Sequence, residues 1–179
     1  MKVIEIDKDS KYLSEIETLY LKTFPEVERV EFSDLVDKKF PNGKFHGLFE
    51  NKSLVGFAYT VETKELLYLL YLAVAQDKRN NKYGSKAISQ LNELYNNKAM
   101  GLSVEAIDSM DDNQKRRINF YKRNGFDLTD YQYELLGQVY YPMVKGDISQ
   151  KQFMSFLDVC FPSYTDVKKR LVQYDNEKV

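Results

Sequence analysis

Ten consecutive apolar residues, Leu66 to Ala75, constrain the fold more than any other stretch of this chain. A membrane-spanning helix needs about 20 such residues, so the run is only about half the length of a transmembrane segment. Polar residues bound it on both sides, which favours a short buried β-strand. Because its side chains are apolar on both faces, such a strand must be covered on both faces. We therefore expect residues 66–74 to form the central strand of a sheet.

A cationic turn and then a helix follow this strand. Between Gln76 and Lys86 four cations accompany one carboxylate, a local charge of +3, whereas 26 basic and 27 acidic residues give the whole chain −1. A turn that enters a helix exposes unpaired N–H groups and the positive end of the helix dipole, which suit a pyrophosphate. The alternative is a solvated helix start that is rich in lysine. The charged residues are Lys78, Arg79, Lys82, Lys86 and Asp77.

The other periodic segments predict a mixed α/β fold in a single domain. Ser10 is a suitable N-cap for a helix that ends before Pro25, and Gly125 is suited to the left-handed position that ends another helix. Two strands should meet at Asn51 and Lys52. Together the segments predict a mostly antiparallel sheet of about seven strands, flanked by helices. The strands are expected at 2–6, 44–50, 53–63, 66–74, 101–107, 126–135 and 138–144, and the helices at 10–24, 33–39, 84–95 and 113–123.

The tail predicts a helical extension, residues 147–179, packed on the domain formed by residues 1–146. Its apolar residues share one helical face, and a homodimer is one arrangement that such helices would allow. Cys160 lies on this face without a basic neighbour, so we expect a small buried hydrophobe rather than a nucleophile. The residues of the face are Phe153, Phe156, Leu157, Cys160 and Phe161, followed by Val167, Leu171 and Val172 in a last short helix.

The composition excludes several classes of protein. With a net charge of −1 the chain lacks the overall positive field that attracts phosphate backbones, so nucleic acid is a poor partner. The single cysteine and the charged first residues favour a cytoplasmic protein without disulfides. The single histidine, His46, excludes most metal sites. Because the alternating pattern of residues 44–50 puts His46 on the face of Lys44 and Glu50, we expect it to have a solvated structural role.

Two motifs carry a family resemblance. The stretch Arg79-x-x-Lys82-x-Gly84-Ser85 resembles the pyrophosphate loop Arg/Gln-x-x-Gly-x-Gly/Ala of the GNAT acyltransferase superfamily. Residues 119–126, Asn-Phe-Tyr-Lys-Arg-Asn-Gly-Phe, resemble its second hallmark, Phe-Tyr-x-x-x-Gly-Phe. The motifs stand in the order that the family uses, and the resemblance extends from Lys2 to Val144. Lys82 departs from the pattern, because it occupies the position of the loop's first glycine.

The resemblance implies the acyl-CoA N-acyltransferase fold, in which the sheet is splayed at its centre. It also implies that the chain transfers an acetyl group from acetyl-CoA, as co-substrate and without a metal, to an amine of a small molecule or a protein. A backbone N–H at the end of the central strand, near Ala73 or Val74, would stabilise the oxyanion. The implied cofactor-binding residues are Ala73, Val74, Arg79, Asn80, Asn81, Lys82, Tyr83, Gly84 and Ser85.

Tyr121 and Glu105 are the expected catalytic residues. Tyr121 matches the motif tyrosine that protonates the departing thiolate in relatives, and its alternative is a half-buried core aromatic. Glu105 shares one face of its strand with Ser103, so it could accept the proton of the amine through water. It could equally pair with Arg116 or Arg117. Glu65 is the rival base, and some relatives use no enzyme base.

Two other classes of function stay open. One is a CoA-binding sensor without turnover, and the other is an interaction protein whose C-terminal helices block the cleft. Aromatic residues on the last strands would form the acceptor-side wall in relatives, but packing of a core or edge is the commoner use of such residues. They are Tyr131, Tyr133, Tyr140 and Tyr141.

Overall fold

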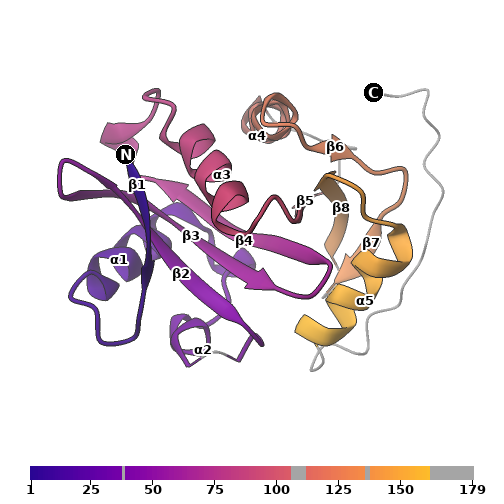
Figure 1. Cartoon of the computed structure of the whole chain (residues 1–179), viewed down its shortest axis with the longest axis horizontal. Coiled ribbons are helices and arrows are strands. Elements are labelled where there is room, and N and C mark those ends of the chain that lie inside the picture. The colour runs from indigo at the N-terminus through magenta and orange to yellow at the C-terminus, as the bar shows by residue number, and fades with distance from the viewer. Residues whose placement is uncertain (38, 106–111, 136–137, 162–179) are drawn as a thin grey trace. The chain divides into compact units, whose positions relative to one another are not determined.

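The computed structural model describes residues 1–37, 39–105, 112–135 and 138–161 (Figure 1). Its Cα positions divide the chain into two units, Met1–Lys98 and Ala99–Val179, and each is described by itself. The expected class is confirmed, because helices accompany strands that pair in antiparallel fashion within each unit. The splayed centre and the boundary between residues 146 and 147 stay predictions. No helix among the residues described is long and apolar enough to cross a membrane.

The first unit contains four antiparallel strands that pair in chain order. These are β1 (Lys2–Ile6), β2 (Gly43–Glu50), β3 (Ser53–Glu62) and β4 (Leu66–Val74). The expected strand at 66–74 is confirmed with the same bounds. Asn51 and Lys52 join β2 to β3, both at positive φ, as a tight connection between antiparallel strands requires. Two register shifts, between Leu48 and Phe49 in β2 and between Tyr59 and Thr60 in β3, interrupt the ladders.

Helices cover both faces of this four-stranded sheet (Figure 1). They are α1 (Leu13–Thr23), α2 (Phe32–Val36) and α3 (Tyr83–Leu94), with short 3-10 turns η1 (Glu26–Glu28) and η2 (Gln76–Lys78). On one face Tyr20 of α1 contacts the rings of Phe57 and Tyr71, at 6.3 and 5.0 Å between centroids. On the other face Ala87 of α3 packs against Leu48 and Val55. Because the side chains of β4 are apolar on both faces, the sequence predicted that both faces would be covered, and they are.

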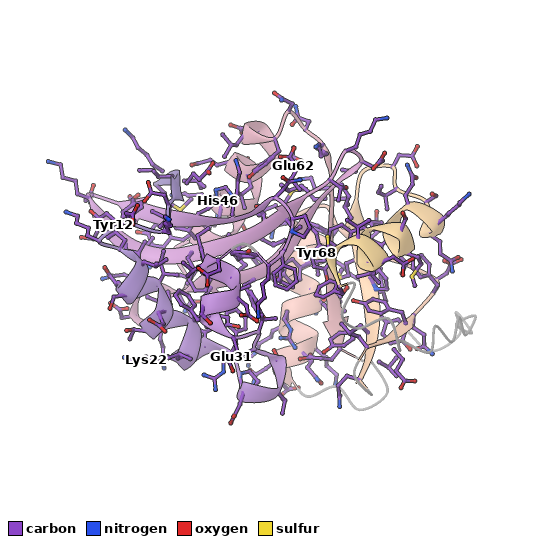
Figure 2. All side chains as sticks on the ribbon, turned by 90° about the horizontal axis from the view of Figure 1, so that it is seen from below. Tyr12, Lys22, Glu31, His46, Glu62 and Tyr68 are labelled. Atoms are coloured by element: carbon purple, nitrogen blue, oxygen red, sulfur yellow. The ribbon has the colours of Figure 1, made fainter. Side chains whose placement is uncertain are left out.

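His46 corrects one of the expectations, because it is fully buried rather than solvated (Figure 2). Its Nε2 lies 3.0 Å from Thr60 Oγ1 and 3.1 Å from Tyr95 Oη, beneath the end of α3. Burial lowers the pKa of His46 to about 4, a neighbouring Glu5 opposes this shift, and Lys44 adds to it. The alternating pattern suggested a solvated face, but β2 lies inside the sheet and α3 covers that face. An alternating pattern therefore did not mark an exposed face here.

The start of α1 is a second correction. The helix begins at Leu13, and its N-cap is Tyr12, which makes no side-chain capping bond. Ser10 acts one turn earlier, where its Oγ accepts a hydrogen bond from Tyr12 N at 3.3 Å and its carbonyl accepts one from Leu13 N at 3.1 Å. The next helix is also shorter than expected, Phe32–Val36 instead of 33–39.

The second unit is built around β8 (Gln138–Lys145). One edge of β8 pairs with β5 (Ala99–Glu105), and it also pairs with β6 (Asp127–Leu128) and β7 (Tyr133–Leu135). The expected single strand at 126–135 is therefore wrong, since it is two short strands, and the described residues hold eight strands instead of about seven. The expected strand at 101–107 begins earlier, at Ala99, and its residues 106 and 107 lie outside the described residues.

Two helices complete the second unit, α4 (Asp112–Arg123) and α5 (Gln150–Cys160). Gly125 follows α4 at φ +84°, which confirms its expected left-handed position. Ser149 and Gln152 form a capping box at the start of α5. The apolar face of α5 is buried, Cys160 included, as the periodicity indicated. The short helix expected around Val167 to Val172 lies outside the described residues.

Candidate functional site

The turn between β4 and α3 is fixed by hydrogen bonds at both of its ends. Ala75 N donates to Val55 O at 2.9 Å, and this bond continues the β3–β4 ladder by one residue. At the other end Asn81 Nδ2 donates to the carbonyls of Lys78 and Arg79, at 3.0 and 3.1 Å. The role of Val55 was missed by sequence reasoning, and a pairing partner 20 residues earlier leaves no local signal.

Two residues of the turn have left-handed backbone. Asn80 has φ +66°, a conformation that asparagine tolerates, and Lys82 has φ +58° and ψ +18°. Lys82 therefore adopts the conformation that glycine reaches at low cost, although it replaces a glycine of the resembled motif.

The N-terminus of α3 leaves its donors open. Lys82 is the N-cap and makes no side-chain capping bond, and the first backbone bond of the helix runs from Lys86 N to Lys82 O. Within the described ranges of the chain, no protein group accepts a hydrogen bond from the backbone N–H groups of residues 80–85. These donors, at the positive end of a helix of 12 residues, fit a pyrophosphate.

The cations of the turn differ in how much of their charge is available. Lys78 pairs with Asp77 at 3.0 Å. Arg79 Nε donates to Val74 O at 3.3 Å, which holds the guanidinium against the end of β4. Lys86 Nζ lies 5.7 Å from the centroid of the Tyr83 ring. Lys82 is exposed beside the open N–H groups, so its charge adds to theirs.

The end of β4 separates the roles of Ala73 and Val74. N–H groups along an antiparallel strand point alternately to its two edges. Because Ala75 N donates to Val55 O, the N–H of Ala73 points to β3 as well, and that of Val74 points to the opposite edge of β4. Of these two residues, Val74 is thus the candidate donor for a ligand.

Glu105, at the end of β5, forms an ion pair with Arg117 of α4. The bond joins Glu105 Oε2 to Arg117 Nη2, and Gln114 Nε2 lies 3.5 Å from the same oxygen. Of the two arginines that the sequence left open, Arg117 is the partner in the structure. The rival, Glu65, is exposed nine residues before Val74, about 30 Å away along an extended strand at roughly 3.3 Å per residue. Glu65 is therefore far from the turn.

Tyr121 lies on α4 between two aromatic neighbours. Its ring makes edge contacts with Phe126 at 5.7 Å and Phe120 at 5.1 Å between centroids. Burial raises the pKa of Tyr121 to about 12, and the nearby Arg117 opposes the shift. The hydroxyl therefore keeps its proton throughout the neutral range and can act as a donor. Tyr121 lies in the second unit and the turn lies in the first, and each unit is described by itself.

The aromatic residues of the last strands pack within the second unit. Tyr133 and Tyr140 stack at 5.7 Å, and Tyr133 Oη donates to Ser103 Oγ at 2.8 Å. Tyr131 and Tyr133 also contact Phe153 of α5, at 6.3 and 6.4 Å. These contacts favour packing as their main role. No group of three or more His, Cys, Asp or Glu side chains is placed to hold a metal, as far as the structure describes the chain.

Comparison with known proteins gives one family throughout. Residues 13–126 match the model of the Acetyltransferase (GNAT) family. YjbC from Bacillus subtilis (strain 168), assigned as an acetyltransferase, is 32% identical over 120 residues, which cover 67% of this chain and 55% of YjbC. The chain thus spans about half the length of this curated relative.

Solved structures show the same likeness. A protein from Bacteroides thetaiotaomicron, assigned to the GNAT family of acetyltransferases, has a TM-score of 0.73 at 26% identity, over 87% of this chain and 92% of that chain. An aminoglycoside 6'-N-acetyltransferase complexed with coenzyme A has a TM-score of 0.67 at 17% identity, over 84% of this chain and 99% of that chain. The second likeness concerns the fold alone.

Proposed function

The chain belongs to the acetyltransferase (GNAT) family, and from this premise we propose that it transfers an acetyl group from acetyl-CoA to a primary amine of a small molecule or a protein. The observation that carries the proposal is the row of open N–H groups at residues 80–85, where the turn that follows β4 enters α3. A solved relative of the same fold is complexed with coenzyme A, which supports the choice of ligand.

The turn is the proposed binding site for the phosphates of acetyl-CoA. The backbone N–H groups of the turn would hold the phosphate oxygens, while the side chains of Arg79 and Lys82 would add charge. Acetyl-CoA would supply the acetyl group as a reactive thioester, whose C–S bond breaks as the C–N bond to the amine forms. The Val74 N–H, directed away from β3, is the proposed donor to the carbonyl oxygen. The proposed binding residues are Val74, Arg79, Asn80, Asn81, Lys82, Tyr83, Gly84 and Ser85, and Ala73 is not proposed as a donor because its N–H points to β3.

Tyr121 is the proposed general acid. Its raised pKa, about 12, keeps the phenol protonated at the pH where an amine acetyltransferase works. The phenol would hold its proton at Oη until the thiolate departs and then donate it. The Tyr121 ring packs against Phe126, and this contact limits rotation of the ring. A proton donor that is held in one orientation is more effective than one that turns freely.

Glu105 is the proposed acceptor of the amine's proton, through water. Its ion pair with Arg117 orients the carboxylate and also occupies one of its oxygens. The same pair favours a second candidate function, a CoA-binding protein without turnover, in which Glu105 serves the stability of the second unit alone.

Two measurements test the proposal on the full chain. Acetyl-CoA at a hundredfold excess over its Kd should raise stability by about 2.7 kcal/mol and therefore raise Tm. Gly84→Trp should abolish this shift because it fills the space beside the open N–H groups, whereas Ser89→Trp, on the exposed side of α3, should keep it. Thiol release with a panel of amines then separates the two candidate functions. A melt that acetyl-CoA does not move would refute both.

A further inference from the structure

The side chain of Gln90 lies between α3 and the open edge of β1. β1 is the terminal strand of its sheet, so alternate residues direct their backbone groups away from β2. Val3 N donates to Gln90 Oε1 at 2.9 Å, and Gln90 Nε2 donates to Met1 O at 3.1 Å. A primary amide carries one acceptor and one donor group, so a single side chain satisfies both backbone groups as a neighbouring strand would.

These two bonds fix α3 in a way that its apolar contacts cannot. The apolar residues that α3 buries are Ala87, Ile88 and Leu91, and of these Ala87 packs against Leu48 and Val55. Apolar contact is non-directional, so the two bonds of the Gln90 amide add a directional constraint to this packing. A slide of one residue would move the helix by about 1.5 Å along its axis. Hydrogen bonds weaken steeply when distance and angle change, so the Gln90 amide resists this movement.

Gln90 shares one face of α3 with the first residue of the helix. Tyr83, Ala87 and Gln90 stand at positions i, i+4 and i+7, which share one helix face. Tyr83 packs against the same cluster as Ala87. Two turns of helix, about 10 Å at about 1.5 Å per residue, separate Gln90 from the first helical residue. A rigid helix of this length transmits the position of Gln90 to the open N–H groups of its first turn.

We infer that Gln90 is a positioning residue, which sets the N-terminal turn of α3 for the phosphates of an acyl-CoA through its two hydrogen bonds to β1. This inference rests on the proposed function, because it concerns the same ligand. The competing role for Gln90 is protection of the β1 edge, which would contribute to stability and leave ligand affinity unchanged.

The test measures acetyl-CoA affinity by calorimetry at 20 °C, where each variant is shown to be folded by circular dichroism. Gln90→Met keeps the length of the side chain and removes both bonds. Glu93→Met introduces the same side chain at an exposed position of α3 and is the matched control. Gln90→Glu, which keeps the acceptor for Val3 N and loses the donor to Met1 O, serves if Gln90→Met does not fold. Hydrogen exchange at Val3 N–H reports the loss of the bond.

We expect Gln90→Met to raise the Kd of acetyl-CoA by about five- to tenfold, the scale of one net hydrogen bond, with Glu93→Met unchanged. Turnover at saturating acetyl-CoA should stay near the wild-type value, because the reacting groups are untouched. A lower Tm with unchanged Kd in both Gln90 variants would overturn the inference and assign Gln90 to edge protection. Failure of the wild-type chain to bind acetyl-CoA would instead overturn the proposed function, and this inference with it.

Discussion

The left-handed backbone of Lys82 gives a prediction whose sign is opposite to the usual one. At φ +58° a residue with a Cβ carries a conformational cost of about 1–2 kcal/mol that glycine does not. Glycine in turn loses about 0.4–1 kcal/mol more through the entropy of the unfolded chain than alanine does. Lys82→Gly should therefore be more stable than Lys82→Ala by about 0.5–1 kcal/mol, or about 1–4 °C in Tm for a chain of this size.

The control for this pair lies seven residues further along the same helix. At Ser89, an exposed interior position of α3, alanine should be more stable than glycine by about 1 kcal/mol. Differential scanning calorimetry of the four variants gives both differences in the same buffer. The order Gly above Ala at Lys82 and Ala above Gly at Ser89 is the expected result.

Binding of acetyl-CoA adds a second readout to the Lys82 pair. Both variants lose the cation, so both should bind more weakly than the wild-type chain, with a smaller dependence on salt. Lys82→Gly keeps the left-handed turn without strain, so its Kd should be no higher than that of Lys82→Ala. If Lys82→Ala is the more stable of the two, the turn is not left-handed at this residue in solution. The arrangement of N–H groups proposed for the phosphates would then be wrong.

Three further predictions concern Tyr121, Glu105 and His46. Tyr121→Phe should leave the Kd of acetyl-CoA unchanged and lower kcat by about 10²- to 10⁴-fold. In the wild-type protein burial raises the pKa of Tyr121 to about 12, so the rate should not depend on Tyr121 ionisation below about pH 11. Full activity of the Phe variant would assign Tyr121 to packing. Glu105→Gln should cost up to about 1 kcal/mol through the lost ion pair and lower kcat/KM most at low pH, where few acceptor amines are neutral; a rate ratio that is flat across pH would remove Glu105 from the reaction. The buried His46 has its pKa lowered to about 4 from 6.5, so its contribution to stability is fully present above pH 6.5 and is lost as pH falls toward 4, by about 3 kcal/mol. Because the chain has 1 His, urea melts of the wild type and of His46→Gln between pH 4.5 and 7 isolate this effect. If the free energy of unfolding changes with pH by the same amount in the two proteins, the prediction is contradicted.

Sequence patterns predicted the elements whose apolar residues repeat at one clear period. The uninterrupted run of β4 and the apolar face of α3 gave bounds close to those observed. His46 shows where this reasoning fails, because a period of two predicts two unlike faces and not which of them is covered. The break between β6 and β7 was equally hidden, since short strands on one edge of β8 depend on their partner.

The candidate site divides in the same way. Chemical type and spacing identified the turn, Tyr121 and Glu105, because a motif records which residues occur in which order. They did not distinguish Arg116 from Arg117 as partner of Glu105, since neighbouring residues of a helix point about 100° apart and only the packed helix decides. Gln90 left a faint signal, a polar residue on the apolar face of α3, but its partners lie nearly 90 residues away.

Lys82 bears on whether the loop motif needs a glycine at its first glycine position. A glycine at this position reaches positive φ without strain, so a different residue there suggests that the turn is lost. The structure keeps the turn, and the bonds that hold it are local: Ala75 to Val55 at one end and the Asn81 amide at the other. Each such bond contributes on the order of 1 kcal/mol, and together they are enough to offset the cost of one left-handed lysine. The physical requirement for an anion site is therefore a row of open N–H groups at a helix start, and a glycine is one of several ways to meet it.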